Sequence, residues 1–150
     1  MDRITRKGSV LFILGPPLLP PKWQPSSFHP NGTGGRMENR TVLIVDDDAA
    51  LRRSNERMFR LAGWKTLIAD GVQQAVELLP QADVVLSDYY MLDGTGADVV
   101  KHAGDTPVVI LSGMTQDVKH KHVLCKPSDP DVILNTVANV LTSHERHSRR

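Results

Sequence analysis

Short apolar runs of strand length alternate with helical patterns along residues 41–141, and this alternation constrains the fold more than any other feature. Five runs have the length and the Val, Ile and Leu content of buried strands: residues 41–45, 64–69, 83–87, 107–112 and 121–125. Apolar residues at helical spacing follow four of them, over about residues 49–62, 72–79, 96–103 and 131–141. Strands joined by helices form a parallel sheet covered on both faces, so we expect an α/β fold.

Polar residues end or follow four of the five runs: Asp46, Asp47, Asp88, Ser112 and Lys126. A doubly wound sheet of five parallel strands can have the order 2-1-3-4-5, in which the first and third strands are neighbours. Ligand sites of such sheets lie at the carboxyl ends of the strands. We therefore expect three carboxylates, one hydroxyl and one ammonium group to converge on this edge.

These groups fit phosphoryl chemistry with a bound cation. Adjacent carboxylates raise one another's pKa, and Mg²⁺ prefers hard oxygen ligands and bridges carboxylates to phosphate oxygens. A carboxylate such as that of Asp88 can form an aspartyl phosphate, while Ser112 and Lys126 can contact phosphoryl oxygens. Two plainer interpretations stay open: Asp88 as a turn residue that ends a strand, and residues 46–48 as a solvated helix cap.

Four motifs resemble those of the receiver domain of two-component response regulators, in the same order and strand context over about residues 40–143. They are VDDD at 45–48, SDYYMLDG at 87–94, ILSG at 110–113 and CKP at 125–127. The resemblance implies a flavodoxin-like fold in which Asp88 accepts a phosphoryl group from a histidine kinase or a phosphotransfer protein. It implies that Ser112 and Lys126 sense this group, and that the Mg²⁺ ligands are Asp46, Asp47, Asp88 and the backbone carbonyl of Tyr90.

The chain departs from the family pattern between Ser112 and Lys126, which are only 14 residues apart. Few apolar residues lie between them, so we expect the fourth helix of the fold to be shortened or missing. Val123 stands three residues before Lys126, where the family usually has an aromatic residue that swings inward on phosphorylation. The missing aromatic weighs against a signal through the usual face, which the fourth helix, fifth strand and fifth helix form.

Bulky residues flank the predicted phosphoacceptor. Tyr90 lies two residues after Asp88, and Met114 lies two residues after Ser112. Both would flank the path of the water that hydrolyses the phosphoryl group, so we expect them to slow dephosphorylation.

The domain organisation follows from where the periodic pattern begins and ends. Residues 1–36 are rich in Pro and Gly and hold no periodic apolar segment, so we expect a disordered extension or a start-site artefact, with translation beginning at Met37. The apolar run 10–14 follows basic residues, as in a signal peptide, but is too short for a membrane span. We expect a receiver domain over 40–143 and a basic disordered tail over 144–150, hence a stand-alone receiver with no DNA-binding domain.

The charge is unevenly distributed, although the net charge is only +1. Residues 1–40 hold six basic and two acidic residues, and residues 144–150 hold three basic and one acidic, so the middle of the chain is acidic. An acidic core argues against nucleic-acid binding. A single cysteine, Cys125, favours a reducing cytoplasmic setting, and we expect it to be a small core residue. The scattered histidines predict no zinc site.

Three functions fit this reading. The chain can be a binding module that is controlled by phosphorylation, or an intermediate or sink in a phosphorelay, which the missing aromatic and the short fourth helix favour. The third is a degenerate receiver that binds proteins without phosphorylation. In none of them does the chain turn over an external metabolite, so we expect no enzyme beyond limited self-phosphorylation and dephosphorylation.

Overall fold

A computed structural model describes residues 39–150 of the chain. The predicted extension over residues 1–36, with its short apolar run, lies outside the described residues. In the described part, no helix is long and apolar enough to cross a membrane.

The core of the structure is a five-stranded parallel sheet with the order β2-β1-β3-β6-β7. Its strands are β1 (Thr41–Val45), β2 (Lys65–Ala69), β3 (Val84–Asp88), β6 (Val108–Ser112) and β7 (Val123–Cys125). Two short antiparallel strands, β4 (Tyr90–Met91) and β5 (Gly94–Thr95), form a hairpin directly after β3. The order in the sheet is the predicted 2-1-3-4-5, which confirms the doubly wound α/β fold.

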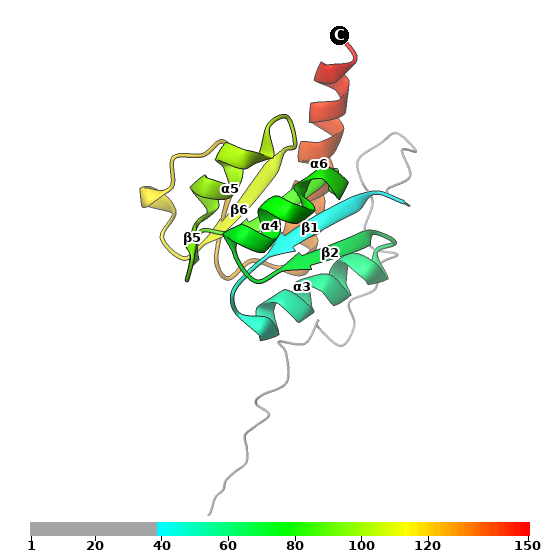
Figure 1. The fold of residues 1–150 in the computed structure, drawn as a ribbon. Helices are drawn as coiled ribbons and strands as arrows, with labels where there is room; N and C mark the ends of the chain where they lie inside the picture. The colour runs from blue at the N-terminus through cyan, green and yellow to red at the C-terminus, as the bar shows by residue number, and fades with distance from the viewer. Residues whose placement is uncertain (1–38) are drawn as a thin grey trace, which may run out of the picture.

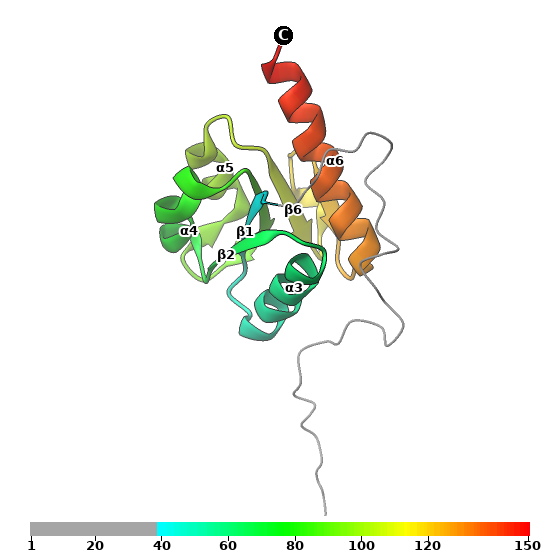
Figure 2. The ribbon, with the colours of Figure 1, turned by 90° about the vertical axis from the view of Figure 1, so that its right-hand side faces the viewer.

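In the described residues, four α-helices cover the two faces of the sheet: α3 (Ala49–Leu61), α4 (Val72–Leu78), α5 (Gly96–Ala103) and α6 (Pro130–Ser148). Figure 2 shows α3 and α6 on one face and α4 and α5 on the other. One 3-10 turn, η2 (Leu79–Gln81), follows α4 directly and contains Pro80.

Successive residues along each strand enter opposite cores, because side chains alternate across a sheet. Val42 and Ile44 of β1 belong to the core with α3 and α6, whereas Leu43 and Val45 belong to the core with α4 and α5. The central strands β1, β3 and β6 are therefore buried over most of their length, as the uninterrupted runs in the sequence predict for a parallel sheet, whereas the edge strand β2 begins with the exposed Lys65.

No α-helix lies between β6 and β7. The segment contains only the 3-10 turn η3 (Thr115–Asp117), which leaves the yellow segment of Figure 1 largely irregular. This confirms the predicted loss of the fourth helix. Val123, at the position of the expected aromatic residue, is half-buried and packs against the core that contains α4 and α5.

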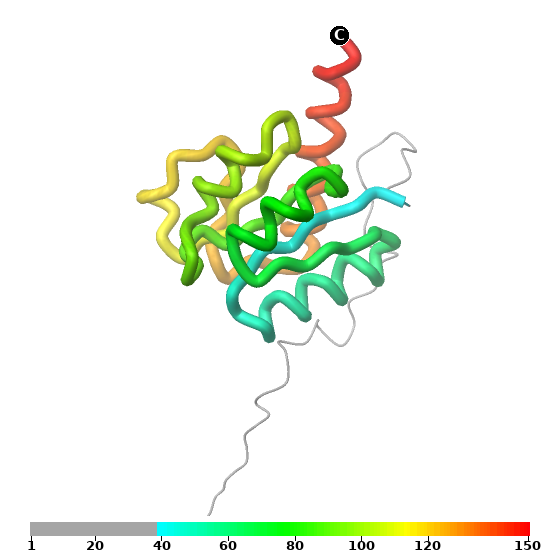
Figure 3. Tube along the Cα trace, in the orientation of Figure 1, coloured from blue at the N-terminus to red at the C-terminus, as the bar shows by residue number. Residues whose placement is uncertain are grey.

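Helix α6 is longer than the sequence pattern predicts, and its end extends away from the rest of the described residues (Figure 3). The helix continues to Ser148, whereas we predicted a receiver ending at residue 143 and a disordered tail over 144–150. An ion pair between Arg40 and Glu145 links this part of α6 to the residue before β1.

The expected burial of Cys125 is wrong, because its side chain is exposed. Cys125 is the last residue of β7, which is an edge strand of the sheet. The fourth helix of the fold, which would flank this edge, is missing, and the segment before β7 contains only η3.

Candidate functional site: an acidic cluster at the carboxyl edge of the sheet

The first and third strands bring two acidic segments together at the carboxyl edge of the sheet. Val45 of β1 pairs with Ser87 of β3. The residues that follow them, Asp46 and Asp88, therefore lie side by side where the two strands end. One carboxylate oxygen from each of Asp46, Asp47 and Asp88 lies within 4.8 Å of the others. The structure therefore assembles the predicted acidic cluster.

The three consecutive aspartates at 46–48 have separate roles. Asp48 is the N-cap of α3, and its Oδ1 accepts hydrogen bonds from the backbone N–H groups of Ala50 (2.9 Å) and Leu51 (3.1 Å). Such a cap satisfies donors that have no partner within the helix. The helix-cap interpretation of the run thus holds for Asp48 alone, which leaves Asp46 and Asp47 for the cluster.

Asp46 is the most buried member of the cluster, with 2% of its surface exposed. Burial raises the pKa of its carboxyl group above the ordinary value, and the charges of Asp88 and Asp47 raise it further. A hydrogen bond of 2.8 Å from the backbone N–H of Asp48 to Oδ1 and the charge of Lys126 oppose this shift. The ionised carboxylates of the cluster therefore repel one another, and a bound cation would reduce this repulsion.

Lys126 follows β7 and reaches across the edge into the cluster. Its Nζ lies 2.9 Å from Oδ1 of Asp88 and 3.7 Å from Oδ2 of Asp46. Its backbone N–H donates to the carbonyl of Ser112 (2.9 Å), which fixes the start of this side chain next to the end of β6. The peptide bond from Lys126 to Pro127 is cis.

The two oxygens of Asp88 have different surroundings. Oδ1 accepts hydrogen bonds from Lys126 Nζ (2.9 Å) and from the backbone N–H of Tyr89 (2.9 Å). Among the described residues, no donor is hydrogen-bonded to Oδ2 of Asp88. One oxygen is thus held in place while the other is free to bind or to react.

Gly96 permits the start of α5 to approach the end of β3 closely. A Cβ atom at this position would lie 3.0 Å from the carbonyl oxygen of Asp88, and the Gly96 N–H donates to the carbonyl of Tyr89 (2.7 Å). A side chain here would force α5 away from the end of β3, so the close approach requires glycine.

Ser112 and Tyr90 lie at the same edge of the sheet. Ser112 ends β6 and is 1% exposed, and its Oγ accepts a hydrogen bond of 3.1 Å from the backbone N–H of Met114. Tyr90 begins β4, two residues after Asp88, and its ring packs edge-on against that of Tyr89. Their roles toward a phosphoryl group and a metal ion stay predictions.

The donor set fits magnesium. Three carboxylate oxygens within 4.8 Å of one another are hard ligands of the kind that Mg²⁺ binds while it retains several water molecules. The raised pKa of Asp46 and the free Oδ2 of Asp88 both agree with a site that is completed by a divalent cation.

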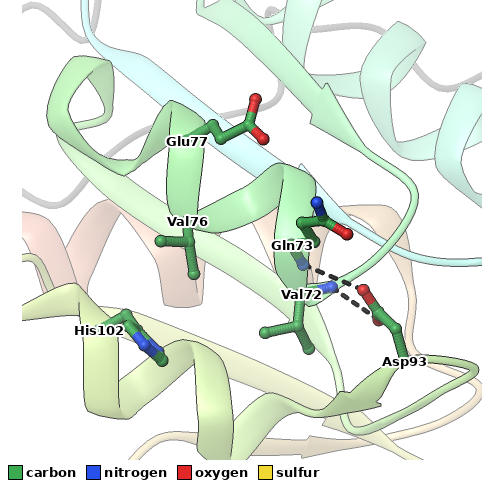
Figure 4. A pocket seen from close by; sticks show the side chains of 6 residues that line it. All are labelled: Val72, Gln73, Val76, Glu77, Asp93 and His102. Atoms are coloured by element: carbon green, nitrogen blue, oxygen red, sulfur yellow. Dashed lines mark hydrogen bonds between the residues drawn. The ribbon is translucent and has the colours of Figure 1, made fainter.

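In the sequence, Asp93 stands out only as the first residue of an Asp-Gly pair within the motif at 87–94, and the structure gives it a larger role. Its Oδ1 and Oδ2 accept hydrogen bonds from the backbone N–H groups of Val72 (2.8 Å) and Gln73 (3.0 Å), so the hairpin after Asp88 caps α4 (Figure 4). These hydrogen bonds lower the pKa of Asp93, that from Gln73 most strongly. Because Asp93 caps a helix that begins about 20 residues earlier in the chain, no local sequence pattern predicts these hydrogen bonds.

Figure 4 shows the same residues at the rim of a shallow groove between α4 and α5. Side chains of six residues line it: Val72, Gln73, Val76, Glu77, Asp93 and His102. The groove contains none of the three acidic-cluster residues, and the chemistry described above lies at the strand ends.

Comparisons with known proteins agree with this geometry. Residues 42–138 match the family model of the response regulator receiver domain. The cell cycle transcriptional regulator CtrA of Caulobacter vibrioides is 26% identical over 122 residues, a match that covers 72% of this chain and 53% of CtrA. The chain thus spans about half the length of this curated relative.

Solved structures share the fold. A CheY-like receiver domain protein from Methanospirillum hungatei superimposes with a TM-score of 0.66 at 18% identity, over 73% of this chain and 99% of that one. The chemotaxis response regulator CheY4 of Vibrio cholerae gives a TM-score of 0.60 at 26% identity, over 68% of this chain and 98% of that one.

Proposed function

Because the chain belongs to the response regulator receiver domain family, we propose that it accepts a phosphoryl group on Asp88 from a histidine kinase or a histidine phosphotransfer protein. The observation that carries this proposal is the position of Asp88, whose Oδ1 is 2.9 Å from Lys126 Nζ within a cluster of three aspartates. The family is mainly a signalling module, and the chain would act on itself rather than on a metabolite.

The transfer moves a phosphoryl group between two protein side chains. Oδ2 of Asp88 attacks the phosphorus atom, the P–N bond to the donor histidine breaks, and the imidazole leaves with its electron pair and takes up a proton. Lys126 pairs with charge on the phosphoryl oxygens, and the Ser112 hydroxyl donates a hydrogen bond to one of them. Both groups lie at the strand ends beside Asp88, which supports these roles.

In this proposal Mg²⁺ is held by Asp46, Asp47, Asp88 and the backbone carbonyl of Tyr90. When bound, the ion neutralises negative charge on the carboxylates and on the phosphoryl oxygens. Asp46 holds its carboxylate toward the cluster through the N–H of Asp48, and Lys126 limits repulsion before the ion binds.

The missing fourth helix favours a relay role over a conformational signal. The segment between β6 and β7 holds only η3. Val123 occupies the position at which the family usually has an aromatic residue. A phosphoryl group on Asp88 therefore lacks two parts of the usual route to an output surface. We propose that the chain passes the group onward or stores it as an intermediate or sink in a phosphorelay.

The test is the intact-protein mass after incubation with Mg²⁺ and acetyl phosphate, for the native chain and for the matched variant Asp88→Asn. We expect a gain of one phosphoryl group in the native chain and none in the variant, with circular dichroism confirming that both are folded. Absence of a mass gain in the folded native chain, with acetyl phosphate and with phosphorylated histidine kinases alike, would favour the alternative of a phosphorylation-independent binding module.

A further inference from the structure

Leu92, in the turn between β4 and β5, is 96% exposed, while the next most exposed large apolar side chain among the described residues, Tyr90, is 52% exposed. Single exposed apolar residues are common on protein surfaces, so exposure by itself indicates little. Leu92 lies four residues from Asp88, however, and Tyr90 and Met114 are also exposed within two residues of Asp88 and Ser112. Three of the six exposed large apolar side chains among the described residues therefore lie within four residues, along the chain, of Asp88 or Ser112.

The hairpin that carries Leu92 is fixed to the domain on both sides. Asp93, the next residue, is hydrogen-bonded to the first turn of α4 at 2.8 and 3.0 Å (Figure 4). Thr95 forms a capping box with Asp98 at the start of α5, with a hydrogen bond of 2.9 Å from its N–H to Oδ2 of Asp98. The side chain of Leu92 is thus presented to solvent from a well-anchored turn.

The local fold does not require leucine at this place. Met91, the preceding residue, packs against the core, whereas Leu92 contributes almost no buried surface. Positions in tight turns usually hold Gly, Asn, Asp or Pro, which satisfy the backbone geometry or remain hydrated. A leucine that neither packs nor shapes the turn is better explained by contact with another molecule.

We propose that Leu92 is a contact residue for the protein that brings a phosphohistidine to Asp88, with its side chain entering an apolar recess on that donor. The inference rests on the proposed function and names the docking element of the same site. Four residues of chain span at most about 14 Å, so Leu92 lies within reach of a protein that places an imidazole against Asp88. A small phosphodonor reaches Asp88 without contacting it.

The test compares a protein donor with a small donor on the full chain. Histidine kinases encoded by the source organism are purified, autophosphorylated and assayed one by one, and the fastest donor is used for the native chain, Leu92→Ser and Leu92→Met. Leu61→Ser is the matched control, because Leu61 is 47% exposed at the end of α3, on the opposite edge of the sheet from Asp88. Acetyl phosphate with Mg²⁺ provides the rate that needs no protein docking.

We expect Leu92→Ser to lower kcat/KM for transfer from the kinase about tenfold or more through a higher KM, since the leucine surface is no longer buried in the complex. Leu92→Met should restore most of the rate, Leu61→Ser should match the native chain, and all should react alike with acetyl phosphate. Equal rates from the kinase to the native chain and to Leu92→Ser would overturn the inference. If acetyl phosphate labels Asp88 but no kinase transfers its phosphoryl group to the chain, the inference is overturned as well. If neither acetyl phosphate nor any kinase labels Asp88, the proposed function itself is refuted.

Discussion

The carboxylate of Asp93 accepts a hydrogen bond of 2.8 Å from the backbone N–H of Val72 and thereby links the hairpin after β3 to the start of α4. Gly71, just before this helix, leaves room for the contact, because a Cβ atom there would lie 2.5 Å from Oδ1 of Asp93. Residue 71 has no side chain that could cap the helix itself, so the cap comes from a distant part of the chain.

Replacement of Asp93 by alanine should destabilise the domain. Asp93→Ala leaves the N–H groups of Val72 and Gln73 without their protein acceptor, and loss of a helix N-cap typically costs about 1 kcal/mol. Urea denaturation followed by circular dichroism measures this difference. The matched control is Asp70→Ala, an exposed acid just before the same helix, because the N–H groups of Val72 and Gln73 donate to Asp93 and not to Asp70. An effect of equal size in that control would show that the loss of negative charge, rather than the cap, is responsible.

The stabilisation by Asp93 should depend on pH. Its pKa is lowered in the folded protein, from an ordinary value of 3.8, because the N–H groups of Gln73 and Val72 bind the ionised carboxylate. A group with a depressed folded pKa contributes stability above its unfolded pKa, and that contribution is lost as the pH falls through the folded pKa. The stability difference between the native chain and Asp93→Ala should therefore be full at pH 6 and shrink below pH 3.8. Denaturation curves for both proteins across this range measure it, and a difference that stays constant contradicts the assignment.

Much of the fold and of the cluster could be predicted because the signals are local. The apolar runs define the strands, and the residues that end them, such as Asp46, Asp88 and Lys126, must meet at one edge once the sheet order is known. The role of Asp93 could not be predicted in this way. An Asp-Gly pair signals a turn, but its acceptor contact with α4 depends on tertiary packing.

Two further differences have the same origin in tertiary context. The residues after Leu141 lack an apolar stripe, yet α6 continues through them, since extending an existing helix costs less than starting one and Glu145 pairs with Arg40. Cys125 looked like a core residue because it belongs to an apolar strand, but that strand lies at an edge of the sheet and the helix expected to flank it is missing.

Asp46→Asn should stabilise the metal-free protein and abolish its response to Mg²⁺. Burial is the largest cause of the raised pKa of Asp46, which means that ionising this carboxyl group costs more free energy in the folded protein than in the unfolded chain. The amide keeps an acceptor for the Asp48 N–H while it removes repulsion from Asp47 and Asp88. We expect a gain of about 1 kcal/mol, or roughly 4 °C in Tm, without Mg²⁺. Thermal melts with and without Mg²⁺ test this, and Asp70→Asn is the control; a variant that Mg²⁺ still stabilises like the native chain excludes Asp46 as a ligand.

The phosphoryl lifetime should be set by Tyr90 and Met114. Both side chains are about half exposed, at 52% and 51%, and each lies two residues beyond a strand end that forms the proposed site, β3 for Tyr90 and β6 for Met114. Bulky groups at these places restrict the approach of water to a phosphoryl group on Asp88. In the double variant Tyr90→Asn with Met114→Glu, a smaller polar group and a carboxylate replace them and can orient a water molecule.

We expect the double variant to lose its phosphoryl group at least about tenfold faster than the native chain, within the range typical of a positioned acid or base. The measurement is the decay of intact-protein mass after acetyl phosphate has been removed. Tyr90→Phe with Met114→Leu is the matched control, because it keeps the bulk and should leave the lifetime unchanged. An unchanged lifetime in the Asn and Glu variant would show that the two side chains do not limit hydrolysis, and that water reaches Asp88 by another path.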